Sequence, residues 1–122
     1  MNITDYIIRY QEHTSGEDEL YRDVEWTSNC YCPVKNLIPG RYVPFIPDKH
    51  LSEPSISCLS VNDTEVVLEN DGYTGDGRLG LQKHTITLNT QNKSWGCFFG
   101  GGKYSTSRSI DLLKPEEVNH ED

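Results

Sequence analysis

The sequence predicts a mainly β protein, built as an antiparallel sheet or a small barrel or sandwich with one or two short helices. Three observations favour this class over an α+β fold, which stays the alternative. The 122 residues contain no alanine, the residue that helices use most freely. Thr, Ser, Val, Tyr and Ile, which suit strands, are common instead, as are the turn formers Asn, Gly and Asp. Several segments alternate apolar and polar residues with the period of two that strands have.

The length is that of one domain, so we expect residues 1–122 to fold around a single core. Only 34% of the residues are hydrophobic, and the core should therefore be thin and depend on aromatic side chains. The acidic residues 119–122 are expected to form a frayed tail.

The first predicted element is a short helix over residues 4–13. In a helix, Ile3, Ile7 and Tyr10 share one face, although the adjacent isoleucines and the tyrosines also suit a strand. The sequence alone leaves both possibilities open for this segment.

A strand is predicted next over residues 17–25. Leu20, Val24 and Trp26 alternate with acidic residues, which indicates a half-buried strand with an acidic outer face. Five of the six prolines then fall within residues 33–54. Proline is excluded from helix interiors and from central strands, so this segment should be a long connection or a sheet edge.

Beyond residue 55 the alternation is clearer. Residues 56–61 and 65–70 flank a short polar turn and predict a β-hairpin. A glycine-rich loop over 71–77 should follow, and then a strand over 79–90. The apolar parity changes within that strand, which predicts a bulge near Lys83–His84.

The last elements are predicted from the region after residue 91. Residues 95–99 alternate as a strand that ends in the glycines 100–102. Residues 103–108 resume a strand, and residues 109–118 predict a short helix interrupted at the last proline.

Two glycine-rich motifs fail as nucleotide sites. The G-x-G-x-x-G string at 75–80 is followed by a strand pattern, whereas a dinucleotide site needs a helix there. The glycines and lysine at 100–103 lack the remaining residues of a phosphate loop. We therefore expect no cofactor, no catalytic residues and no enzymatic activity.

The four cysteines are expected to be reduced thiols without a metal. Cys30 and Cys32 are separated by one residue, closer than paired zinc ligands usually are. Cys58 and Cys97 lie in apolar strand patterns, which indicates buried thiols. The N-terminal residues show no secretory signal pattern and no apolar run approaches membrane-span length, so we expect a cytoplasmic protein.

The net charge of −8 restricts the partners. It disfavours direct binding to nucleic acid or to an anionic membrane surface, and it suits a basic protein attracted over a distance. Two acidic stretches, within residues 17–25 and 63–76, contain tyrosines that can serve as apolar anchors. The residues that we expect to face the partner are Glu17, Asp18, Glu19, Tyr21, Asp23, Glu25, Asp71, Tyr73 and Asp76.

These features favour an acidic binding protein that neutralises a basic partner. In its small size, its acidity and its lack of catalytic motifs, the chain is similar to bacterial immunity proteins, which plug the active site of a toxic nuclease. It shares no family signature with them, so the similarity implies only a type of function.

Two alternatives from other classes stay open. The first is a small β-barrel enzyme or ligand-binding protein with a polar mouth formed by Glu69, Arg78, Lys83 and His84, and with Tyr73 and Trp95 stacking a ligand. The second is an accessory subunit from a phage or mobile element, which would carry an exposed apolar patch on the proline-rich segment 33–54.

Overall fold

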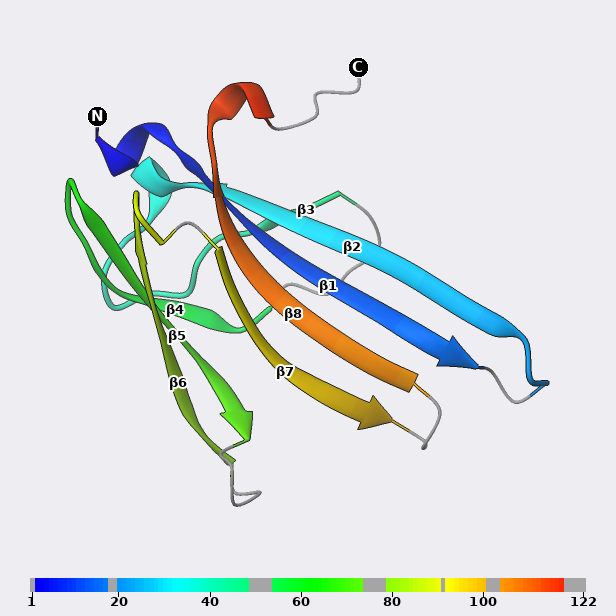
Figure 1. Cartoon of the computed structure of the whole chain (residues 1–122). Helices are drawn as coiled ribbons and strands as arrows, with labels where there is room; N and C mark the ends of the chain where they lie inside the picture. Colours follow the sequence, from blue (N-terminus) through cyan, green and yellow to red (C-terminus); the bar gives the residue numbers. More distant parts are fainter. Residues whose placement is uncertain are drawn as a thin grey trace.

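Two antiparallel β-sheets dominate the computed structural model, which describes residues 2–17, 20–48, 54–73, 79–90, 92–100 and 104–117. Figure 1 shows the two sheets facing each other at one end of the molecule and diverging toward the other. The strands of the described chain are β1 (Ile7–Glu17), β2 (Asp23–Pro33), β3 (Ile46–Pro47), β4 (Ile56–Val61), β5 (Glu65–Tyr73), β6 (Leu79–Thr87), β7 (Asn92–Gly100) and β8 (Tyr104–Leu113). The predicted mainly β, antiparallel fold is confirmed.

The larger sheet has five strands in the order β3-β2-β1-β8-β7. β1 is its central strand and pairs along its full length with β2, and over ten residues with β8. The β1–β8 pairing joins residues about a hundred positions apart in sequence, such as Ile8 and Leu112. The β7–β8 pairing has a register shift between Trp95 and Phe98.

The smaller sheet has three strands in the order β4-β5-β6. β4 and β5 form the predicted hairpin, with Ile56 opposite Asn70 and Val61 opposite Val66. Its turn is fixed by Asn62, whose side-chain oxygen accepts hydrogen bonds from the backbone N–H groups of Thr64 and Glu65 at 2.9 Å each. Asparagine is favoured in turns because its side chain can bond to the backbone in this way.

The core lies between the sheets, where both contribute alternate residues. Ile8 and Tyr10 of β1 and Ile110 and Leu112 of β8 face the smaller sheet, because successive side chains of a strand point to opposite faces. The remaining buried hydrophobic residues are Ile3, Tyr6, Cys30, Cys32, Val34, Leu37, Val43, Phe45, Ile56, Cys58, Val66, Leu68 and Ile86.

The proline-rich connection links the two sheets along one side. Val43 donates its backbone N–H to Ile56 at 2.7 Å, and Cys58 donates to Arg41 at 2.9 Å, so this stretch lies along β4. A few residues later, β3 pairs with β2. Its described residues thus run along β4 and then form a two-residue strand at the margin of the larger sheet.

The two predicted helices are wrong. Residues 4–13 contain a single 3₁₀ turn, η1 (Ile3–Asp5), and then β1. The described part of 109–118, residues 109–117, contains the end of β8 and another such turn, η3 (Pro115–Glu117). Burial alternates with a period of two over residues 6–10, and residues 109–113 are held in β8 by their pairing with β1. In both segments long-range pairing in a sheet overrides a local pattern that also fits a helix. With η2 (Val34–Asn36), these turns are the only helical segments in the described residues.

Two further details differ from prediction. The pairing of β5 with β6 keeps an uninterrupted register from Leu79 to Thr87, so the bulge expected near Lys83–His84 is absent; a register shift occurs in β4 instead. The predicted strand over 17–25 is wrong, because β1 ends at Glu17, Leu20 lies in a turn and β2 begins at Asp23. Leu20 is 69% exposed in that turn and Trp26 is 51% exposed, so neither belongs to the core.

Candidate functional site

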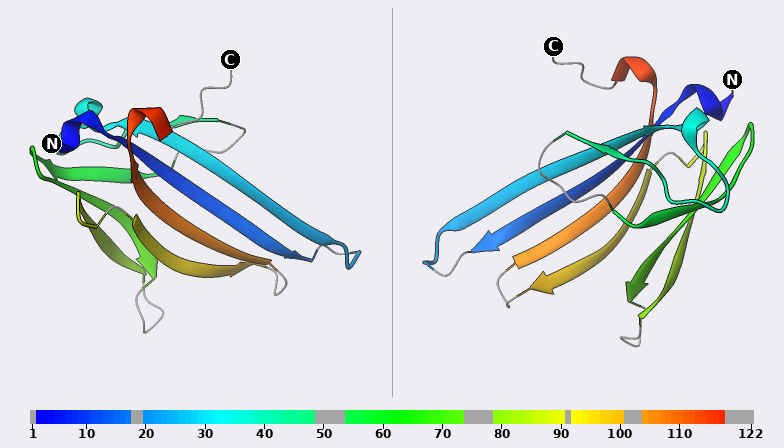
Figure 2. Two further views of the ribbon diagram at one scale, coloured as in Figure 1. Left: turned by 45° about the horizontal axis from the view of Figure 1, so that its top comes forward. Right: turned by 180° about the vertical axis from the view of Figure 1, so that it is seen from behind.

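The β1–β2 hairpin projects beyond the rest of the molecule. Both strands have eleven residues, but their buried side chains lie mainly in the halves near the core. Figures 1 and 2 show the far end of the hairpin extending away from the three-stranded sheet. In the described part of the hairpin end, residues 15–17 and 20–26, most side chains are therefore exposed to solvent and none belongs to the core.

Three carboxylates gather at the hairpin end. Glu17 lies directly opposite Asp23 in the β1–β2 pairing, and Glu25 lies opposite Ser15. All three side chains are exposed. They share the outer face of the sheet, the face turned away from the core, because they occupy alternate positions of their strands. Like charges opposite each other destabilise a strand pair, so this arrangement weakens the hairpin.

Apolar side chains accompany these carboxylates. Tyr21 is 75% exposed and has a left-handed backbone, with φ of 59°, which turns the chain between the strands. A non-glycine residue in this conformation is uncommon and costs about 1 kcal/mol or more. With Leu20 and Trp26, the hairpin end thus combines negative charge with apolar surface.

The hairpin end also carries an open depression of about 470 Å³. It is lined by Ser15, Gly16, Glu17, Asp23, Val24 and Glu25.

The structure does not unite the two acidic stretches. Asp71 and Tyr73 belong to β5 of the smaller sheet, while Glu17, Tyr21, Asp23 and Glu25 lie at the hairpin end of the larger one. Figure 2 shows β7 and β8 between these two regions. Three further residues predicted for the site, Asp18, Glu19 and Asp76, lie outside the described residues.

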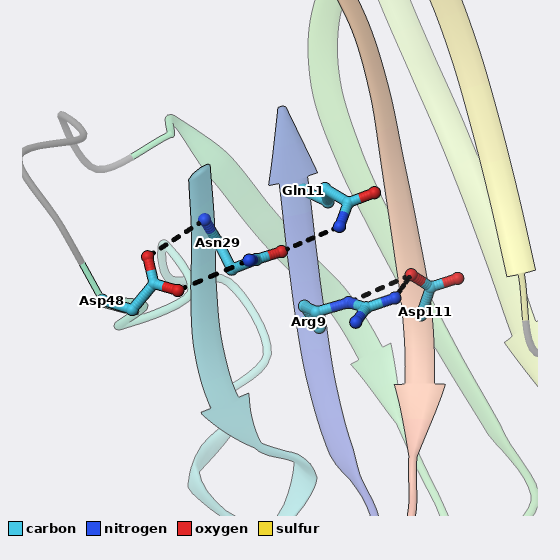
Figure 3. A network of polar contacts seen from close by, with 5 residues as sticks. All are labelled: Arg9, Gln11, Asn29, Asp48 and Asp111. Atoms are coloured by element: carbon cyan, nitrogen blue, oxygen red, sulfur yellow. Dashed lines mark hydrogen bonds and ion pairs between the residues drawn. The ribbon is translucent and has the colours of Figure 1, made fainter. Parts of the chain in front are cut away.

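A network of polar contacts continues along the outer face from the hairpin toward the core (Figure 3). Gln11 donates to the side chain of Asn29 at 3.1 Å, and Asp48 accepts from the backbone and side-chain nitrogens of Asn29 at 3.2 and 3.4 Å. Arg9 donates from Nε and Nη2 to Asp111 Oδ2 at 3.2 and 2.5 Å. These contacts link β1 to β2, β2 to the residue after β3, and β1 to β8.

His13 lies between this network and the carboxylates. Its Nδ1 is 2.7 Å from Thr27 Oγ1, and its Nε2 is 4.0 Å from Glu25 Oε2. The imidazole thus connects β1 to the acidic end of β2.

A second set of polar side chains lies on the inner faces of the two sheets, and the sequence did not predict it. His84 Nε2 contacts Asn70 Oδ1 between β6 and β5, and both side chains are buried. On β1, Tyr10 donates to Glu12 at 3.4 Å, and Arg108 of β8 donates to the same carboxylate at 3.1 Å. Burial, and secondarily the charge of Glu12, raises the pKa of Tyr10 to about 12.

This arrangement does not support the polar mouth of the ligand-binding alternative. His84 faces the core, whereas Lys83 and Glu69 pair with each other on the opposite face of the small sheet. The other residues of that hypothesis, Arg78 and the side chains of Tyr73 and Trp95, lie outside the described part. The only sequence signal for the inner polar group was the polar alternation of β6, which also fits a solvated strand.

The described cysteines are buried free thiols. Cys30, Cys32 and Cys58 are each fully buried, and burial raises the pKa of Cys32 to about 11 and also raises that of Cys58. A thiol is a metal ligand or nucleophile only as thiolate, so these environments disfavour both roles. Within the described residues, no three His, Cys, Asp or Glu side chains group as metal ligands do. The same residues contain no helix of the length and apolarity needed to cross a bilayer.

No protein family, curated protein or solved structure matches this chain. The hairpin end is therefore defined as a candidate site by its own geometry, charge and exposure.

Proposed function

We propose that this chain is an acidic binding protein that captures and neutralises a basic protein through the end of its β1–β2 hairpin. The observation that carries the proposal is the exposed cross-strand pair Glu17–Asp23, with Glu25 beside it. Repulsion between these carboxylates does not help the fold, but a basic partner would relieve it. The charges would accelerate encounter and set orientation.

The apolar residues at the hairpin end can supply the binding energy that exposed charges do not. Exposed rim charges contribute mainly to association rate, whereas buried aromatic residues dominate the binding energy of interfaces. Tyr21 is exposed at the turn beside the carboxylates, and Trp26 is exposed on the opposite face of β2; both can become buried in a complex. A hairpin that presents both kinds of side chain on a hydrogen-bonded sheet supports a protein partner.

The proposed partner is a nuclease toxin, and the proposed role is that of an immunity protein. A nuclease has a basic cleft because its substrate is a polyanion, and an acidic protrusion is complementary to such a cleft. The cytoplasm is part of the proposal, since disulfides are rare there and the three described cysteines are free thiols.

Charge reversal at the hairpin end tests this function. The variant D23K/E25K and the control D63K/E116K each shift the net charge from −8 to −4, so they differ only in position. Asp63 and Glu116 are exposed, in the β4–β5 turn and in η3, away from the hairpin end. We expect D23K/E25K to slow association with the basic partner by roughly tenfold and to flatten its salt dependence. The control should do neither.

The partner is to be identified by crosslinking in the source cell and purified for stopped-flow measurements. Its nuclease activity is then measured with and without one equivalent of this chain, and melting temperature monitors folding of the variants. Equal association rates for D23K/E25K and D63K/E116K would remove the hairpin from the proposal. A partner whose nuclease activity is unaffected would remove the immunity role.

Exposed apolar residues favour a second candidate, the accessory subunit of a larger assembly. Ile38, Tyr42 and Ile46 of the connection 33–54 are all more than half exposed. The same crosslinking experiment separates the candidates. If the variant Y42S/I46S loses the partner while D23K/E25K keeps it, the accessory role is the better description.

A further inference from the structure

We infer that the partner is held by strand addition: an extended segment with alternating basic and apolar residues pairs with the free edge of β2 between Asp23 and Ser28. This inference rests on the proposed function and specifies the form of its partner. It is carried by the segment Asp23–Ser28 of β2, whose strand pairing among the described residues is to β1.

β3 protects only one end of β2. It pairs with Cys30 and Tyr31, and Asp48 extends this contact by donating its backbone N–H to Asn29 O at 3.0 Å. Within the described residues, the six positions from Asp23 to Ser28 pair with β1 alone. Six residues of strand extend over about 20 Å, enough for a ladder of several hydrogen bonds. Figure 1 shows this part of β2 as the margin of the sheet.

Asn29 shows which backbone groups face outward. Both its N–H and its C=O bond to Asp48, on the side away from β1. In an antiparallel strand the two groups of one residue point to the same side, and alternate residues repeat that direction. Thr27, Glu25 and Asp23 therefore direct their N–H and C=O groups to the open edge, where no described residue pairs with them. An unpaired edge of this kind accepts another extended strand.

The side chains beside this edge specify the sequence of the added strand. Asp23, Glu25 and Thr27 lie on the outer face, whereas Val24 and Trp26 lie on the inner face. An added strand would continue both faces. Its residues next to the carboxylates would be Lys or Arg, and those next to Val24 and Trp26 would be apolar. The expected partner segment therefore alternates basic and apolar residues over about six positions.

Two synthetic peptides test the inference on the full chain. The probe is acetyl-Lys-Val-Lys-Val-Lys-Val-amide, and its control has the same sequence with the lysine backbone nitrogens methylated. Methylation preserves side chains and charge but blocks the N–H groups that would pair with β2. Binding is measured by NMR titration up to about 1 mM, with amide exchange read at Glu25 and Thr27.

We expect the probe to protect the amides of Glu25 and Thr27 from exchange, and the methylated peptide to bind at least about tenfold more weakly, since it loses two or three hydrogen bonds. Equal binding of both peptides would overturn strand addition and leave the charge-based function intact. Failure of both peptides to bind would contradict both proposals.

A variant of the chain provides an independent check. The variant T27P removes one backbone N–H group, that of residue 27, which points to the open edge. The hydrogen bonds between β2 and β1 are therefore retained. T27V is the matched control, because both variants lose the hydroxyl that contacts His13. We expect T27P to bind the probe several-fold more weakly than T27V. Equal affinities would count against edge pairing, and the unfolding midpoint of each variant establishes that it is folded.

Discussion

At the scale of single residues, polar side chains on the outer face of the larger sheet act in fixed pairs. Asp111 shows this best, because it points outward from β8 and is nevertheless only 6% exposed. Arg9 of the neighbouring strand covers it and donates two hydrogen bonds to one of its oxygens. A carboxylate at such a site is tolerated because a cation and hydrogen bonds replace its hydration.

The variant R9A should therefore lower the free energy of unfolding by about 2 kcal/mol, because it leaves the buried carboxylate without its cation. Urea unfolding at neutral pH measures the change. R9K keeps the positive charge, so its free energy of unfolding should fall less than that of R9A. In the double variant R9A/D111A the loss should be smaller than the sum of the single losses. Additive losses would show that the pair is not coupled.

At the scale of elements, the sequence predicts strands well where one local signal decides the structure. The β4–β5 hairpin was predicted because alternation and turn residues agree over 56–70. The β1 segment fits a helix as well as a strand in the sequence, because its structure depends on β8, its partner from the other end of the chain. The end of β8 was not predicted for the same reason, because its strand structure depends on pairing with β1.

The β4–β5 turn gives a test at this scale. N62A removes the acceptor of two backbone N–H groups, and we expect it to lower the free energy of unfolding by roughly 1 kcal/mol. N62D retains an acceptor oxygen and should be closer to wild type. Urea midpoints decide between them. A loss in N62D equal to that in N62A would mean that the side-chain oxygen does not support the turn.

The candidate site shows the same division between local and long-range information. The acidic residues and Tyr21 were visible in the sequence, and so was the absence of catalytic motifs. The alignment of Glu17 with Asp23 was not visible in the sequence, because it depends on the position of the turn between β1 and β2. The open edge of β2 was not visible either, because it depends on how far β3 extends along β2. A shift of one residue in that register would move the carboxylates to the opposite face.

At the scale of the whole molecule, the two sheets are joined on one side and share one core. Two ionisable groups of that core, the phenol of Tyr10 and the thiol of Cys32, stay protonated in the folded chain at neutral pH. The folded chain favours the protonated forms of Tyr10 and Cys32, since burial raises the pKa of Tyr10 from 10 to about 12 and that of Cys32 from 9 to about 11. Deprotonation of either group places a charge between the sheets, so it opposes the packing that holds them together.

The resulting prediction concerns stability in alkali. The unfolded chain releases these protons at lower pH than the folded chain, so the stabilising contribution is complete below pH 9. It is lost as the pH rises from 9 to 11 for Cys32 and from 10 to 12 for Tyr10. The variant Y10F has no phenol to ionise in the core, and its urea midpoint should fall less between pH 9 and 12 than that of wild type. Y42F is the matched control, because Tyr42 is 70% exposed and its ring lies outside the core. Parallel curves for Y10F and Y42F would show that the two sheets separate in alkali for a reason other than the Tyr10 phenol.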